Sequence, residues 1–276
     1  MITHRPDDGG VHVSASLEDA TLARNRVAQP TLAAFQVAAW AQVASALPAP
    51  LLVAGYSVGE VAACSAAGGY DGPTAIRVAA ERAAAMDAAT GAPSGLAAVL
   101  GLAEARVRSL AAAAGVAIAI RNGPRHFIVG GTDPSLAAFA AAANDAGATR
   151  VQRLCVNTPA HTPALAAAVP PFAAVLADAI APGRLAVPMR SAIDAAALRT
   201  GEEAAAALAR QLATPLDWAA CMDVMAELAP AAILEIGPGD ALTRMFAEAA
   251  PDVPVRALDA FRAPAAAVDW VRRQAR

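Results

Sequence analysis

The sequence predicts an α/β protein, in which a large domain with a parallel sheet carries a small ferredoxin-like domain inserted into it. Three observations predict this fold. An apolar run at 51–55 turns directly into a helical pattern, and a similar strand, turn and helix pattern follows at 231–246. Between them, apolar runs and helical patterns follow one another in the order β-α-β-β-α-β, which is typical of the ferredoxin-like unit.

The first elements lead to a sharp turn. Residues 30–47 predict a helix with Pro30 in its first turn, where a missing N–H is tolerated. The run LLVAG at 51–55 is short, apolar and ends in glycine, as a buried parallel strand does. Helices are expected over 58–67 and after Asp71, which is placed to cap the second of them.

The middle of the chain predicts the small domain. Its expected elements are a strand at 96–102, a helix at 103–114, strands at 116–120 and 127–131, a helix at 134–146 and a strand at 149–156. We therefore expect a small ferredoxin-like domain at 93–158. Residues 1–92 and 159–276 would form the large, α/β-hydrolase-like domain.

Composition excludes several classes of function. The net charge is −3, and all 21 basic residues are arginine, so neither a polyanion-binding surface nor a catalytic lysine is expected. Three scattered cysteines predict neither a disulfide framework nor a metal site, and they favour a cytoplasmic protein. The uncharged stretch from Val27 to Gly59 is interrupted by prolines, which favours a buried helix and strand over a membrane span.

Ser57 is the first candidate for chemistry. It lies in the pattern G-x-S-x-G, between Gly55 and Gly59, at the predicted strand-to-helix turn. Such a turn exposes a serine hydroxyl above the edge of the sheet and is typical of a nucleophile. The alternative is a structural serine in a turn of small residues.

A serine nucleophile needs a base, and His161 is the best-placed histidine. His126 starts an apolar run in the small domain, where a structural role is the simpler interpretation. No histidine follows His161, whereas α/β-hydrolases place their catalytic histidine near the end of the chain. An ordinary hydrolase triad therefore fits poorly.

Arg82 is the third candidate. It shares a helical face with Val78, Ala79 and Met86, so its guanidinium is expected to be buried. A buried arginine needs an anionic partner, which is either a carboxylate of the protein or one of a substrate.

These residues lie within a larger resemblance. The segments GYSVGEVAA, ERAAAMDAATG, IRNGPRHFIVGGT, NTPAHTPAL, RQLATPLDW and LEIGPGDAL resemble the malonyl-CoA:acyl-carrier-protein transacylase family. Tyr56 and the closing stretch ALDAFR make the chain most similar to the epsilon subunit of malonate decarboxylase within that family.

The resemblance implies a covalent acyl-transfer mechanism. Ser57 would be the acylated nucleophile and His161 its base, and the main-chain carbonyl of Gln211 would orient the histidine in place of a triad aspartate. The main-chain N–H of Val58 would stabilise the oxyanion.

The resemblance also implies the substrate and its contacts. Arg82 would grip the malonyl carboxylate, and Gln29 and Asn122 would help to bind the substrate. Malonyl-CoA would be the donor, and the phosphopantetheine-type thiol of an acyl carrier protein the acceptor, with other malonate decarboxylase subunits as further partners. No permanent cofactor, metal, nucleic acid or membrane is implied.

One departure from the family stands out. Its members begin with a strand and a G-Q-G-x-Q loop, and HRPDDGGVHVSAS does not resemble that segment. We therefore expect weak transfer unless residues 1–18 replace the loop. A serine thioesterase or hydrolase and a non-catalytic scaffold subunit stay open as alternative functions.

Overall fold

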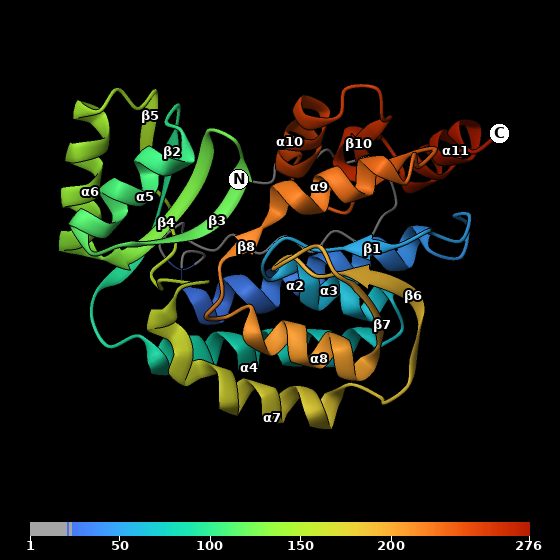
Figure 1. Ribbon diagram of the computed structural model, residues 1–276. Coiled ribbons are helices and arrows are strands. Elements are labelled where there is room, and N and C mark those ends of the chain that lie inside the picture. Colours follow the sequence, from blue (N-terminus) through green and yellow to red (C-terminus); the bar gives the residue numbers. More distant parts are fainter. Residues whose placement is uncertain (1–20, 22–23) are drawn as a thin grey trace.

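The computed structural model describes Thr21 and residues 24–276 (Figure 1). The expectation about residues 1–18 lies outside these described residues. The helices are α2 (Asn25–Val43), α3 (Gly59–Ala66), α4 (Gly72–Ala89), α5 (Glu104–Ala114), α6 (Asp133–Asp145), α7 (Val169–Ala179), α8 (Gly201–Arg210), α9 (Trp218–Glu227), α10 (Ala241–Ala249) and α11 (Pro264–Gln274). The strands are β1 (Val53–Ala54), β2 (Ser94–Leu100), β3 (Ala117–Gly123), β4 (His126–Thr132), β5 (Arg150–Arg153), β6 (Arg184–Arg190), β7 (Ala197–Thr200), β8 (Leu216–Asp217), β9 (Ile233–Glu235) and β10 (Val255–Ala257).

The predicted β-α-β-β-α-β order is present at 94–153 and forms one sheet with the strand order β5-β2-β4-β3-β8. The strands β5, β2, β4 and β3 pair antiparallel with one another in that order. Helices α5 and α6 lie together on the outer side of this sheet (Figure 1), where Val107, Phe127 and Phe139 are fully buried. Strand β8 joins β3 in parallel, so residues 216–217 extend this sheet from a distant part of the chain.

The prediction of a parallel sheet in the large domain is correct only in part. β1 pairs in parallel with β6, but β7 pairs antiparallel with β6. The connection from β6 to β7 covers only residues 191–196, and a parallel crossover needs about a dozen residues or more. Among the described residues, β9 and β10 form a separate two-stranded parallel sheet.

The prediction that Pro30 lies in a first turn is also wrong. Helix α2 already begins at Asn25, because the amides of Val27 and Ala28 donate to the carbonyl of Arg24. The additional turn brings Asn25 and Gln29 beside helix α4, where the Asn25 side chain donates to the carbonyl of Ala83 over 3.2 Å. Helix α4 itself starts as predicted, with the Asp71 side chain accepting from the amide of Thr74.

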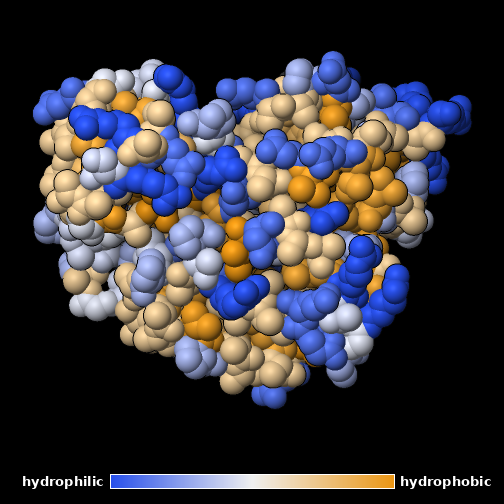
Figure 2. All heavy atoms as spheres, viewed as in Figure 1, coloured by the Kyte–Doolittle hydropathy of each residue, from blue (hydrophilic) through white to orange (hydrophobic). Residues whose placement is uncertain are grey.

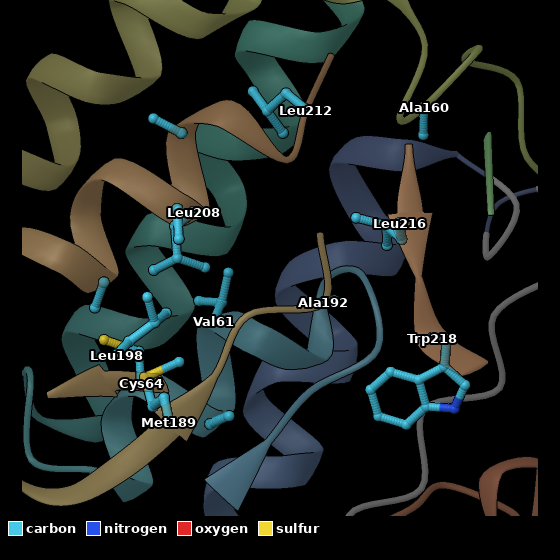
Figure 3. Close-up of a cluster of buried hydrophobic side chains, with 14 of the residues drawn as sticks. Val61, Cys64, Ala160, Met189, Ala192, Leu198, Leu208, Leu212, Leu216 and Trp218 are labelled. Carbon is cyan, nitrogen blue, oxygen red and sulfur yellow. The ribbon is translucent and has the colours of Figure 1, made fainter. Parts of the chain in front are cut away.

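Helix α3 is packed between strands and helices in the core of the molecule. Figure 3 shows Val61 and Cys64 of this helix facing Met189 of β6 and Leu198 of β7. Leu208 of the neighbouring helix α8 belongs to the same cluster. This packing fixes the helix that follows Ser57. No helix among the described residues is both long and apolar enough to cross a membrane.

Candidate active site

Ser57 lies at the sharp turn that the sequence predicts between β1 and α3. Its φ of 54° is in the left-handed region, which residues other than glycine rarely adopt. Such backbone strain is typical of functional turns. The turn also brings the backbone of Gly55 against that of Gly59 and Glu60. A Cβ on Gly55 would overlap the Gly59 carbonyl and the Glu60 nitrogen, so only glycine fits there.

The two glycines of the G-x-S-x-G pattern should therefore respond differently to alanine. Gly55→Ala forces backbone atoms apart, and we expect it to cost about 3 kcal/mol of unfolding free energy or more. At Gly59 a Cβ would meet only the Gln36 side chain, at 3.7 Å, so Gly59→Ala should change stability by at most about 1 kcal/mol. Urea denaturation measures both variants, and equal losses would contradict this account of the turn.

His161 is positioned as a base for Ser57. Its Nε2 lies 2.7 Å from Ser57 Oγ, and its Nδ1 lies 2.5 Å from the main-chain carbonyl of Gln211. Since a carbonyl only accepts hydrogen bonds, Nδ1 carries the proton and Nε2 is free to accept one. The His161 amide also donates to the Leu212 carbonyl, which ties the histidine backbone to the end of α8.

The electrostatic environment keeps His161 neutral. The side chain is fully buried, and burial is the main cause that lowers its pKa from 6.5 to about 3. The positive charge of Arg82 lowers this pKa further, while the hydrogen bond to Gln211 raises it. A neutral imidazole is the form that can take a proton from serine.

Arg82 is buried next to this pair, with 1% of its surface exposed. Its Nη1 donates to Gln29 Oε1 over 2.7 Å and its Nη2 to Gln211 Oε1 over 2.8 Å, and Nη2 lies 3.5 Å from Ser57 Oγ. Within the described residues no carboxylate forms a salt bridge with Arg82, and its Nε has no hydrogen-bond partner. The direct contacts of this cation are thus neutral amides, which leave it able to bind an anion beside the serine.

The other predicted site residues lie at different distances from Ser57, His161 and Arg82. Gln29 contacts Arg82 directly, and Val58 lines the same cavity as Ser57. Asn122 lies apart, since its Oδ1 accepts from the Tyr56 hydroxyl over 3.1 Å and its Nδ2 is 3.3 Å from His126 Nε2. It is absent from the lining of the cavity within the described residues, so it connects β3 and β4 to the turn at Ser57.

Two features of the site were missed by the sequence analysis. Glu60 is buried and accepts a hydrogen bond from the Gln211 side chain, which in turn accepts one from Arg82. The signal for Glu60 was present in the sequence, because it is a carboxylate on the face of a short helix that otherwise buries Val61 and Cys64.

Ser57, His161 and Arg82 line a cavity of about 870 Å³ between α2, α3, β1 and the β9–α10 segment. Its wall is mainly apolar, and it reaches the exposed side chains of Leu51 and Leu228. Figure 2 shows apolar surface gathered on the right of the view, around β1 and α9. Among the described residues, no cluster of three or more His, Cys, Asp and Glu side chains could hold a metal ion.

Known proteins share this sequence pattern and fold. The acyl transferase domain family matches residues 8–261. The malonyl CoA-acyl carrier protein transacylase of Mycobacterium tuberculosis (strain H37Rv) is 32% identical over 250 residues, covering 89% of this chain and 81% of that protein. The Escherichia coli (strain K12) transacylase of the same name is 29% identical over 249 residues, covering 87% of this chain and 80% of that protein.

Among solved structures, a type II PKS acyl-carrier protein in complex with its malonyl-transacylase matches with a TM-score of 0.83 and 26% identity. The match covers 90% of this chain and 82% of that one. A serine at a strained turn, a buried histidine and a buried arginine are thus found in a chain whose sequence matches acyl transferases over nearly its whole length. The protein belongs to the acyl transferase domain family.

Proposed function

We propose that this protein transfers a malonyl group from malonyl-CoA to the thiol of an acyl carrier protein through an acyl-serine intermediate. The observation that carries the proposal is the contact of Ser57 Oγ with both His161 Nε2, at 2.7 Å, and Arg82 Nη2, at 3.5 Å. One group activates the nucleophile and the other can bind a carboxylate on the acyl group. The names of the related transacylases support the same donor and acceptor.

In the first half-reaction His161 Nε2 takes the proton of Ser57, and Oγ attacks the thioester carbon of malonyl-CoA. The main-chain N–H of Val58 donates to no backbone carbonyl in the described part of the chain, so it is available to the developing oxyanion. The carbon–sulfur bond then breaks, His161 returns the proton to sulfur, and the coenzyme A thiol leaves. The Gln211 carbonyl stabilises the imidazolium that forms in between.

The second half-reaction runs these steps in reverse with a different thiol. The phosphopantetheine thiol of the carrier protein gives its proton to His161, and its sulfur attacks the malonyl ester of Ser57. The ester bond breaks, and Oγ recovers its proton from His161. A mainly apolar cavity disfavours water as a competing nucleophile, which suits transfer rather than hydrolysis.

Arg82→Met should change the acyl selectivity of the enzyme. The variant keeps the apolar stem but loses the charge, and a charge-assisted pair of this kind contributes about 1.5–3 kcal/mol. We expect kcat/KM for malonyl transfer to fall about 10- to 100-fold, while acetyl transfer stays similar or improves. An equal loss for both acyl groups, measured with malonyl-CoA and acetyl-CoA, would make Arg82 a structural residue.

We place the enzyme in malonate decarboxylase, as its epsilon subunit, with the carrier subunit of that complex as acceptor. Tyr56 and the closing ALDAFR stretch support this assignment. Cys64, Cys155 and Cys221 are all unpaired, which suits a cytoplasmic location. Co-purification with the decarboxylase carrier subunit, against a fatty-acid carrier protein as control, tests the choice of partner.

We also propose the two-domain organisation that the sequence suggests, with residues 93–158 as the small ferredoxin-like domain. The antiparallel pairing among β2, β3, β4 and β5 supports it. Ser57, His161 and Arg82 all lie outside this segment. The small domain reaches the site through Leu96, Ile120 and Ile128, which line the cavity from β2, β3 and β4. The hydrogen bond between Tyr56 and Asn122 also places β3 against the turn that holds Ser57.

Incubation with malonyl-CoA, followed by intact mass spectrometry and addition of carrier protein, tests the proposed function. A stable malonyl adduct that is discharged by the carrier thiol is the expected result. Release of coenzyme A without a carrier would instead identify a thioesterase, and the absence of both adduct and turnover would identify a non-catalytic subunit.

A further inference from the structure

Glu60 is a buried carboxylate that the acyl-transfer steps above do not use. It lies in the first turn of α3, three residues after Ser57, with 1% of its surface exposed. One carboxylate oxygen accepts from the Ala192 amide over 2.7 Å, and the other accepts from Gln211 Nε2. Burial raises the pKa of Glu60 to about 8, against the Ala192 hydrogen bond and the charge of Arg82, so burying this group costs free energy.

Glu60 and Arg82 together fix the orientation of the Gln211 amide. Both carboxyl oxygens of Glu60 accept hydrogen bonds, one from Ala192 and one from Gln211, whereas a guanidinium offers only donors. The amide therefore satisfies both neighbours in one orientation, with Nε2 toward Glu60 and Oε1 toward Arg82 Nη2, and the structure has that orientation. Turning the amide over would place donor against donor at Arg82.

The amide also separates the carboxyl group of Glu60 from the guanidinium of Arg82. A direct ion pair would occupy the guanidinium, whereas Gln211 keeps the carboxylate of Glu60 one residue away. At that distance Glu60 still raises the pKa of Arg82, which burial lowers to about 10. Arg82 consequently stays charged at neutral pH, while its Nε and the N–H groups near Ser57 are left for an incoming anion.

We propose that Glu60 is a positioning residue for acyl-group selection, which holds Gln211 so that Arg82 presents its guanidinium to a carboxylated acyl group at Ser57. This inference rests on the proposed function. It separates two roles of Gln211. The main-chain carbonyl accepts a hydrogen bond from His161. It is held in place at the end of α8, where the main-chain N–H of Gln211 donates to Ala207. The side chain, held by Glu60, serves Arg82.

Glu60→Gln tests the proposal because it preserves shape but replaces one acceptor with a donor. The new amide has one oxygen, which can accept from the Ala192 N–H or from Gln211 Nε2. Its NH₂ group then faces the remaining donor. We expect kcat/KM for malonyl transfer to fall about 10- to 100-fold, chiefly through KM. Acetyl transfer should keep its wild-type rate, since it does not need Arg82. Asp194→Asn is the control, because Asp194 is an exposed carboxylate on the same 191–196 connection as Ala192 and should leave both activities unchanged.

A second variant covers the possibility that Glu60→Gln alone does not fold. In Glu60→Gln/Gln211→Glu every donor again meets an acceptor, so the melting temperature should recover. Its carboxylate lies directly on Arg82 and should compete with the malonyl group, so malonyl selectivity should stay low. Wild-type selectivity in either variant, or equal losses of malonyl and acetyl transfer in Glu60→Gln, would overturn the inference. A wild-type protein that is acylated by neither acyl-CoA would overturn the proposed function and this inference with it.

Discussion

Ser57→Ala is expected to abolish the covalent malonyl adduct and reduce acyl transfer to background. The variant removes the hydroxyl oxygen that lies 2.7 Å from His161 Nε2, so the proton acceptor is left without a nucleophile to activate. Intact mass spectrometry after incubation with malonyl-CoA measures the adduct, and peptide mapping of the wild-type protein locates it.

Ser65→Ala is the matched control for this experiment. Ser65 lies on the same helix α3 but outside the cavity lining found among the described residues. This variant should label as completely as the wild type. An adduct that persists in Ser57→Ala, or that maps to another residue, would remove Ser57 from the mechanism.

His161→Gln is expected to lower the rate of Ser57 acylation by about 10²–10⁴, the usual loss when a general base is removed. Glutamine is chosen because the side chain is fully buried and a smaller residue would leave a cavity. His126→Gln should lose far less, because His126 Nε2 contacts Asn122 rather than the serine. The reverse ranking of the two variants in stopped-flow acylation would move the base to β4.

The same histidine predicts the pH dependence of acylation. A base acts in its neutral form, and an ordinary histidine loses that form below pH 6.5. The pKa of His161 is lowered to about 3, so its neutral form persists as the pH falls and is lost only near that value. We expect kcat/KM for acyl transfer to stay level between about pH 7 and 5. A decline centred near 6.5 would show that His161 is protonated more easily than its burial implies.

Much of the fold and part of the site follow from local sequence. The apolar run at 51–55 followed by G-x-S-x-G predicts the turn that holds Ser57, because a buried strand, a tight glycine turn and a helix start each leave a local pattern. The order of elements at 94–153 follows from periodicity for the same reason. Sequence also selected His161 over His126, although only its position after the small domain favoured it.

The sequence did not predict how the strands of the large domain pair. Strand direction in β7 depends on the short connection at 191–196 and on the space beside β6, neither of which has a residue signature. The sequence likewise predicted an anionic partner for Arg82, whereas its direct acceptors in the folded protein are side-chain amides.

Only the tertiary structure decided that these acceptors are Gln29 and Gln211, with Glu60 behind them. Gln29 and Gln211 lie 53 and 129 residues from Arg82 in the chain, and they meet it because α2, α4 and the end of α8 pack around one point. Such contacts depend on the packing of whole helices, so they become visible only when the chain is folded. Local pattern thus predicted the groups proposed to react, and the packing of distant elements determined how they are held.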